Sequence, residues 1–98
     1  PMRDTVKRGA AGGRIEASVP RSELWRALTP QLFRFGRLRS ALRSALAEGN
    51  AAVAITDEAS AIERSGGRPL LVVGADDNIK VTTLHDLALA EFILTSPA

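Results

Sequence analysis

The chain has 98 residues, of which 45% are hydrophobic and 24% charged, a composition typical of one globular domain with a modest core. The absence of cysteine excludes disulfides and thiolate metal sites, and no apolar run approaches the roughly 20 residues that span a membrane. The first residues lack the apolar core of a signal peptide, so we expect a cytoplasmic protein with no membrane partner.

The net charge of +2 conceals an uneven distribution along the chain. Residues 1–43 carry ten Lys/Arg and three Asp/Glu, a net charge of +7, whereas residues 44–98 carry three and eight, a net charge of −5. A basic half can attract an anionic partner, although most of these arginines are expected to form a solvated surface. Nucleic acid is not an expected partner, because one Trp, three Phe and no Tyr offer few rings for stacking on bases.

The first predicted element is a two-stranded hairpin with extended segments at residues 3–8 and 14–19. In the second segment apolar and polar residues alternate, which is the period of a half-buried strand. The apolar positions are Ile15, Ala17 and Val19. The glycine-rich stretch 9–13 lacks the Gly-Lys-Ser/Thr ending of a phosphate-binding loop and is predicted to be a flexible turn. Because an isolated hairpin is marginal in water, it is expected to pack on something else, such as a second subunit.

Residues 20–33 are predicted to be irregular, and a helix is predicted over residues 35–48. Its apolar residues recur at helical spacing. They are Phe35, Leu38, Leu42, Ala45 and Leu46. Thr29 followed by Pro30 fits a helix N-cap with proline at the first helical position, and Gly49 fits the C-terminal end.

The next predicted elements are a short strand, a short helix and a longer strand. The first strand covers residues 53–55, and Thr56 or Asp57 then caps a helix that ends near Arg64 and is stopped by Gly66 and Gly67. Residues 69–73 form an apolar run without alternation, which is typical of a strand buried on both faces of a parallel sheet.

The last predicted helix runs from Leu84 to about Leu94. It begins with a signal like a capping box, in which Asp86 stands three residues after Thr83. His85 in its first turn is the only histidine, and a lone surface histidine is more often solvated than catalytic. Without a second histidine or a cysteine, a zinc site is not expected.

Strands that alternate with helices favour an α/β layer. Two or three short strands are nevertheless too few for a free-standing sheet of this class. We therefore expect the chain to be a fragment whose missing strands lie upstream of Pro1.

Lys80 is the first candidate for anion binding. It stands between Ile79 and Val81, two apolar residues that are predicted to be buried in a strand, just before the last helix. A lysine in this position can extend into a cleft and hold a phosphate as a point charge. The alternative is an ordinary surface lysine that pairs with Asp76 or Asp77, and the sequence leaves both readings open.

Three further residues carry chemistry suited to phosphate. Arg21 offers the planar fork of a guanidinium, although it can equally be a plain surface arginine. Thr29 and Thr56 each precede a predicted helix, where a hydroxyl and free backbone N–H groups make a phosphate-binding corner. Plain N-capping would also explain both threonines.

Five segments, in order along the chain, together resemble the 2-C-methyl-D-erythritol 4-phosphate cytidylyltransferase family of non-mevalonate isoprenoid synthesis. The segments are Arg3–Arg8, Arg21–Gln31, Ile55–Ala61, Asp77–Thr82 and Asp86–Glu91. They keep the order and spacing of the family across nearly the whole chain.

The resemblance implies an α/β fold, namely the C-terminal part of a Rossmann-like nucleotidyltransferase sheet with a protruding β-arm. It assigns residues 1–26 to the arm and residues 27–98 to the α/β part of a single C-terminal fragment. In this family the arm exchanges between two subunits, so a homodimer is implied.

The resemblance also implies a reaction and the residues that serve it. CMP is transferred from CTP to methylerythritol phosphate, with release of pyrophosphate and with Mg2+ as cofactor. Arg21 and Lys80 match catalytic residues that position the substrate phosphate for attack on the α-phosphorus of CTP. Thr5, Thr29 and Thr56 match further contacts to methylerythritol phosphate.

The family's glycine-rich CTP loop and its metal-binding aspartate have no counterpart in the chain. Mg2+ is therefore expected to be bound mainly by the missing N-terminal half, and the 98 residues alone are expected to be inactive. Two alternatives stay open: a fragment of the sister enzyme that acts on ribitol 5-phosphate, and a non-enzymatic dimerisation module.

Overall fold

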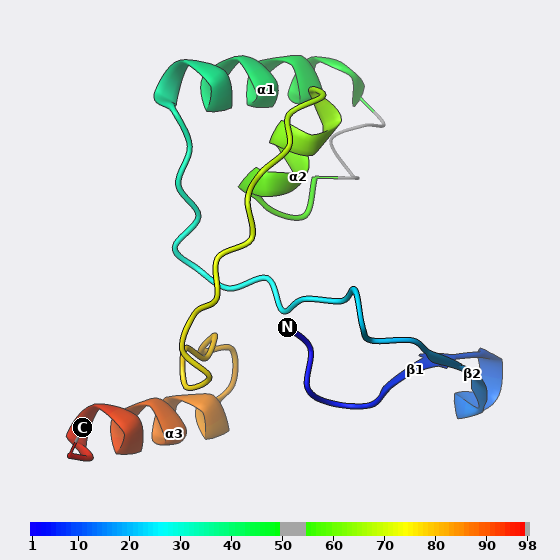
Figure 1. Cartoon of the computed structure of the whole chain (residues 1–98), viewed down its shortest axis with the longest axis vertical. Helices are drawn as coiled ribbons and strands as arrows, with labels where there is room; N and C mark the ends of the chain where they lie inside the picture. The colour runs from blue at the N-terminus through cyan, green and yellow to red at the C-terminus, as the bar shows by residue number, and fades with distance from the viewer. Residues whose placement is uncertain (50–54, 98) are drawn as a thin grey trace. The chain divides into compact units, whose positions relative to one another are not determined.

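A computed structural model describes residues 1–49 and 55–97 and divides the chain into two compact units. Unit 1 comprises Pro1–Leu28 and Ala75–Ala98, and unit 2 comprises Thr29–Gly74. Unit 1 contains the strands β1 and β2 and the helix α3, and unit 2 contains the helices α1 and α2 (Figure 1).

The predicted hairpin is present at the start of unit 1. Strand β1 (Val6–Gly9) pairs antiparallel with β2 (Ile15–Val19), and the register is irregular between Arg8 and Gly9. A short 3-10 turn over Ala11–Gly13 joins the strands and uses the positive φ angles that glycine adopts without strain. The predicted burial is only partly present, because Ile15 is 66% exposed and Val19 is half-buried.

The rest of unit 1 is joined by a few polar contacts between distant segments. The Met2 amide donates to the Leu24 carbonyl at 2.8 Å, which closes the base of the hairpin. The Arg3 guanidinium pairs with the Asp76 carboxylate at 3.1 Å, and Arg26 donates to the Asp76 carbonyl at 3.5 Å. These two contacts join Asp76, in the segment that precedes α3, to Arg3 and Arg26.

Helix α3 (Leu84–Thr95) begins with the predicted capping box. The Asp86 amide donates to the Thr83 hydroxyl at 3.2 Å, and the Asp86 carboxylate accepts from the Thr83 amide at 2.9 Å. The amides of Thr83 and Thr82 lower the pKa of Asp86, since they stabilise its charged form. Leu84, Phe92 and other apolar residues of α3 are exposed. Within the described ranges, no helix is long and apolar enough to cross a bilayer.

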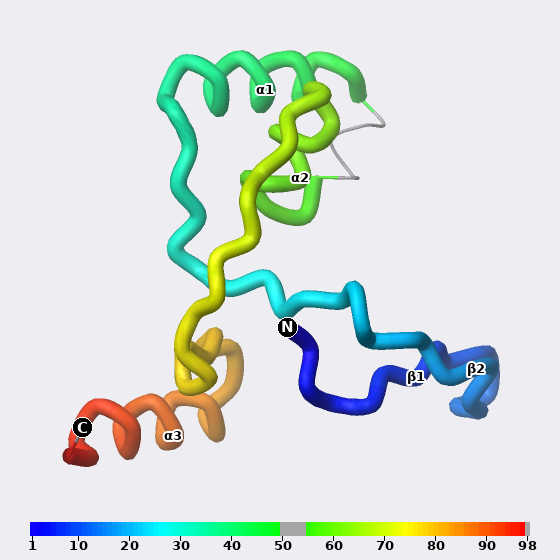
Figure 2. The backbone as a smooth tube through the Cα atoms, viewed as in Figure 1, coloured from blue at the N-terminus to red at the C-terminus, as the bar shows by residue number. Residues whose placement is uncertain are grey.

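In unit 2, α1 (Phe35–Ala47) packs against α2 (Glu58–Arg64), as the backbone trace shows (Figure 2). The contact buries Ala41, Ala61 and Ile62 and partly buries four larger residues around them. These are Phe33, Leu38, Leu42 and Ile55. The predicted apolar face of α1 is therefore only partly covered in unit 2.

Two glycines end α2 as the sequence indicates. The Gly67 amide donates to the Ile62 carbonyl at 2.9 Å, and the Gly66 amide donates to the Glu63 carbonyl at 3.0 Å. This pair of bonds is the Schellman motif, and Gly66 has the positive φ of 89° that the motif requires. A Cβ on Gly67 would meet Ile62 Cγ2 at 2.5 Å, so glycine is also needed there for space.

The prediction of a helix N-cap at Thr29 with Pro30 at the first helical position is wrong. Residues 29–34 are not helical, the Thr29–Pro30 peptide is cis, and α1 is preceded by Arg34, which makes no side-chain capping bond. The reason is a tertiary contact: the side chain of Gln31 is hydrogen-bonded to the first turn of α2, which holds this segment as a connection.

The predicted strand at residues 69–73 is also not formed. Leu70 and Val72 are 90% and 84% exposed, and the segment runs as unpaired backbone beyond α2 (Figure 2). A buried strand needs a neighbour on each side, and the described residues supply none for this run. Of the strand predicted at 53–55, residues 53 and 54 lie outside the described residues, and Ile55 is not in a strand.

Candidate functional site

The five predicted substrate contacts fall into two groups. Thr5, Arg21 and Lys80 lie in unit 1, and Thr29 and Thr56 lie in unit 2. All five side chains are exposed. Each group is connected internally by contacts that the sequence did not predict.

In unit 1, Arg3 connects Arg21 with the segment that leads to Lys80. The Arg21 guanidinium donates to the backbone carbonyl of Arg3, and the Arg3 side chain pairs with Asp76, four residues before Lys80. Thr5 follows two residues after Arg3. A single arginine therefore links the three segments that carry the predicted phosphate and substrate contacts of unit 1.

Lys80 lies in an irregular connection rather than in a strand. Two turn-like bonds precede it, from the Asn78 amide to the Ala75 carbonyl at 3.2 Å and from the Ile79 amide to the Asp77 carbonyl at 2.9 Å. Its neighbour Ile79 is half-buried, whereas Val81 is 51% exposed, so the predicted burial on both sides is only partly present.

The charge of Lys80 has no carboxylate partner within the described ranges. The surface pairing with Asp76 that the sequence left open is not formed, because Asp76 pairs with Arg3 instead. The ammonium group is therefore exposed to solvent and available to an anion as a point charge.

In unit 2, Gln31 joins the segment that carries Thr29 to the start of α2, which Thr56 precedes. Its side-chain amide donates to Asp57 Oδ2 at 2.9 Å and accepts from the Ala59 amide at 3.0 Å. Thr29 lies two residues before Gln31, and Thr56 is adjacent to Asp57. The side chain of Gln31, which is not among the five predicted contacts, thus connects the two segments that carry these threonines.

The first turn of α2 is occupied by its own side chains. The Ser60 amide donates to Asp57 Oδ1 at 2.8 Å, and the Ser60 hydroxyl accepts from the amides of Thr56 and Asp57 at 3.0 and 3.2 Å. With the Ala59 amide bonded to Gln31, four amides near the expected phosphate-binding corner are in use, namely those of Thr56, Asp57, Ala59 and Ser60. Asp57 is the N-cap, and Thr56 precedes it.

The charge state of Asp57 reflects this network. The Gln31 amide is the largest influence that lowers the pKa of Asp57, followed by the Ser60 amide. Both donors stabilise the carboxylate form. Asp57 therefore acts as the N-cap of α2. Its pKa is lowered, whereas a general base would need a raised pKa.

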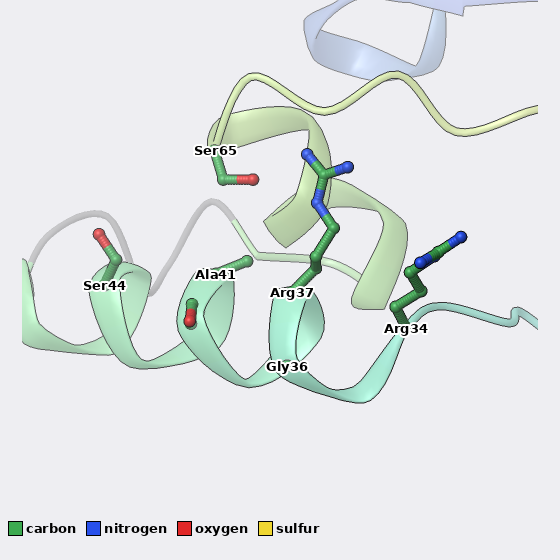
Figure 3. Close-up of a pocket in the computed structure, with 7 residues that line it drawn as sticks. Arg34, Gly36, Arg37, Ala41, Ser44 and Ser65 are labelled. Atoms are coloured by element: carbon green, nitrogen blue, oxygen red, sulfur yellow. The ribbon is translucent and has the colours of Figure 1, made fainter.

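A shallow depression of about 740 Å³ lies along α1 (Figure 3). Arg34, Arg37 and Ser65 line it, together with Ser40 and Ser44. In Figure 3 the Arg37 side chain extends from α1 toward α2, whereas Arg34 points away. None of the five predicted contacts lines this depression.

The described residues do not fit a metal site. No group of three or more His, Cys, Asp or Glu side chains in the described ranges could hold an ion. Asp57 and Asp86 cap helices, and Asp76 pairs with Arg3.

Comparison with known proteins gives the family. The family model described as IspD, 2-C-methyl-D-erythritol 4-phosphate cytidylyltransferase, matches residues 1–96. A protein of that name from Stenotrophomonas maltophilia (strain K279a) is 55% identical over 98 residues, which are 100% of this chain and 41% of the relative. One from Vibrio atlanticus (strain LGP32) is 57% identical over 95 residues, covering 97% of this chain and 39% of the relative.

A solved structure agrees with this assignment. The crystal structure of 4-diphosphocytidyl-2C-methyl-D-erythritol synthase matches with a TM-score of 0.77 and 46% sequence identity. The match covers 96% of this chain and 40% of that chain, so both share an α/β nucleotidyltransferase fold over the aligned part. The chain thus spans about two fifths of the length of these relatives, in their C-terminal part. From residue 1 to residue 96, the chain belongs to the 2-C-methyl-D-erythritol 4-phosphate cytidylyltransferase family.

Proposed function

We propose that these 98 residues act as the C-terminal segment of a cytoplasmic enzyme that transfers CMP from CTP to 2-C-methyl-D-erythritol 4-phosphate in non-mevalonate isoprenoid synthesis. The observation that carries the proposal is the family match over residues 1–96, together with 55% identity to a relative that bears this name. The segment contributes contacts to the phosphorylated sugar alcohol, and the rest of the enzyme contributes the CTP site.

The transfer requires a phosphate oxygen of methylerythritol phosphate to attack the α-phosphorus of CTP. A new P–O–P bridge forms while the bond to the bridging oxygen of the β-phosphate breaks, and pyrophosphate leaves. Two anions must approach each other, so catalysis depends on positioning and charge neutralisation.

Arg21 and Lys80 suit this task in complementary ways. The guanidinium of Arg21 presents a planar fork to phosphate oxygens, and the ammonium of Lys80 offers a point charge without a carboxylate partner in the described ranges. Support for their joint action comes from Arg3, which bonds to Arg21 through its carbonyl and to Asp76 through its side chain.

The three threonines serve as hydroxyl contacts to the same substrate. Thr5, Thr29 and Thr56 are exposed, and each can donate to or accept from the hydroxyl and phosphate groups of a sugar alcohol. Thr56 contributes through its hydroxyl, since its own amide and the amides of Ala59 and Ser60 are already bonded within unit 2.

The hairpin is proposed as the arm of a homodimer that completes the partner's site. Most of its residues are exposed, and only Val6 and Val19 are half-buried. A two-stranded sheet with so little cover is marginal in water, so a second subunit would stabilise it. Mg2+ is proposed as the cofactor on family grounds, held by residues outside this segment.

A chimera tests the proposal directly. The aligned segment of the Stenotrophomonas maltophilia K279a relative is replaced by these 98 residues, and pyrophosphate release is measured with CTP and methylerythritol phosphate. We expect turnover that depends on both substrates, with little turnover of ribitol 5-phosphate in a competition assay.

Three results would contradict the proposal. A folded chimera without turnover removes the enzymatic role and leaves a dimerisation module. Preference for ribitol 5-phosphate assigns the sister activity. A chimera that is active as a strict monomer removes the proposed role of the hairpin.

A further inference from the structure

The Gln31 side chain makes two hydrogen bonds between distant segments of unit 2. It donates to Asp57 Oδ2 at 2.9 Å and accepts from the Ala59 amide at 3.0 Å, across 26 and 28 residues of sequence. It is half-buried, and both ends of its amide are in use. The two bonds together fix the rotation of the amide plane, since reversing the amide would place donor against donor and acceptor against acceptor.

The position of this contact relates it to the substrate residues. Thr29 lies two residues before Gln31, so its backbone cannot move far while Gln31 is held. Thr56 is adjacent to Asp57, and its amide is bonded to the Ser60 hydroxyl. The Gln31 side chain therefore adds two directional bonds between the segments that carry the threonines, beside the apolar packing of Phe33 and Ile55 on the shared core.

Simple helix capping does not require Gln31. Asp57 and Ser60 form a complete capping box, in which the Ser60 amide donates to Asp57 and the Ser60 hydroxyl accepts from the Asp57 amide. What Gln31 adds is the link between the start of α2 and the segment that begins at Thr29.

We propose that Gln31 is a positioning residue for methylerythritol phosphate, which sets the spacing of Thr29 and Thr56 through its bonds to Asp57 and Ala59. This inference rests on the function proposed above. It assigns Gln31 no contact with the substrate: the amide has both of its groups occupied, and its effect passes through the two threonines.

The test measures both Michaelis constants of the chimera after Gln31→Met, which keeps the length of the side chain and removes both bonds. We expect KM for methylerythritol phosphate to rise roughly ten- to a hundredfold, the scale of a hydrogen bond to a charged group. KM for CTP should stay within about twofold, because Gln31 positions only the threonines. Leu32→Met is the matched control, since Leu32 is 85% exposed and adjacent.

A second pair of variants separates positioning from a loss of folded protein. Gln31→Glu places a carboxylate against Asp57 and should also raise KM for methylerythritol phosphate. Adding Asp57→Asn restores a donor opposite the new acceptor and keeps a good N-cap, so we expect the double variant to recover most of the loss. Simple loss of folded enzyme would lower kcat in proportion and leave both KM values unchanged.

The outcomes distinguish this inference from the proposed function. A wild-type chimera without turnover overturns the proposed function and this inference with it. A wild-type chimera with turnover, combined with an unchanged KM for methylerythritol phosphate in Gln31→Met, overturns the positioning role alone. Equal rises in both KM values, or a double variant no better than Gln31→Glu, would also overturn it.

Discussion

The start of α2 shows how a few residues can settle a question that the sequence left open. Thr56 and Asp57 were both candidates for the N-cap, and the structure assigns the cap to Asp57. Gln31 then accepts from the Ala59 amide, and the Ser60 amide donates to Asp57. These two amides are therefore not open to a phosphate, whereas the Thr56 side chain is exposed.

The titration of Asp57 should report this network. The folded-state pKa of Asp57 is lowered, chiefly by Gln31, so its contribution to stability is present above the ordinary aspartate pKa of about 3.9. That contribution is lost as the pH falls through the lower folded-state pKa. In a carbon-13 NMR titration of the chain, the Asp57 carboxyl should titrate below the ordinary value, and Gln31→Met should move its pKa upward.

Asp86 serves as the internal control for the Asp57 titration. The pKa of Asp86 is also lowered, but by the amides of Thr83 and Thr82 rather than by Gln31. Gln31→Met should therefore leave the Asp86 titration where it is. An Asp57 pKa that does not change in this variant would show that the Gln31 bond is absent in solution.

Glycine at the end of α2 provides a test of local packing. In Gly67→Ala the new Cβ would meet Ile62 Cγ2 at 2.5 Å and the Ile62 carbonyl oxygen at 3.0 Å, so we expect a loss of about 1–3 kcal/mol in the free energy of unfolding. Urea unfolding followed by far-UV circular dichroism measures the loss. Gly36→Ala is the control, since nothing lies within 4 Å of its Cβ and alanine favours a helix. Equal stabilities for the two variants would contradict the described packing.

At the scale of elements, the helices and the hairpin form from residues that are close in sequence, whereas the strand predicted at residues 69–73 needs a neighbouring strand. Helices α2 and α3 carry their start signals within four residues, and both were predicted close to their observed bounds. The hairpin was predicted for the same reason, because its turn and strands are contiguous in sequence. Residues 69–73 instead expose four large apolar side chains in a row, namely Leu70, Leu71, Val72 and Val73.

This apolar segment should promote association of the chain. An unpaired, uncharged run of β-branched and leucine residues is a template for strand pairing between molecules. We expect Val72→Lys to reduce species larger than a dimer, as measured by sedimentation velocity on the 98-residue chain. Leu32→Lys removes a side chain of similar exposure outside the run and should have a smaller effect. Identical size distributions for the two variants would contradict this role.

What the sequence could and could not predict follows from the range of the interactions. Capping boxes and glycine stops depend on residues within a turn of each other, so Thr83 and Gly66 could be read directly. The helix start predicted at Thr29 was wrong because the Gln31 side chain is hydrogen-bonded to Asp57 and Ala59, which lie 26 and 28 residues further along the chain. Gln31 was missed as a site residue for the same reason, since one sequence gives no sign of its distant partners.

At the scale of the whole molecule, the two units each hold part of the predicted substrate contacts. In unit 1, Arg3 contacts both Arg21 and Asp76, which lies four residues before Lys80. In unit 2, Gln31 connects the segments that carry Thr29 and Thr56. The residues proposed to contact one small substrate are thus organised as two local clusters. The family match extends over the residues of both units.

The measurement that tests the central claim most directly is the kinetic effect of Lys80→Ala in the chimera, with methylerythritol phosphate as the varied substrate. Removing a charged phosphate contact should lower kcat/KM for methylerythritol phosphate by roughly a hundredfold or more while KM for CTP changes little. Arg68→Ala is the control, since Arg68 is an exposed cation outside the hairpin and is not among the proposed substrate contacts. A value of kcat/KM for Lys80→Ala equal to that of the Arg68→Ala control would contradict the account.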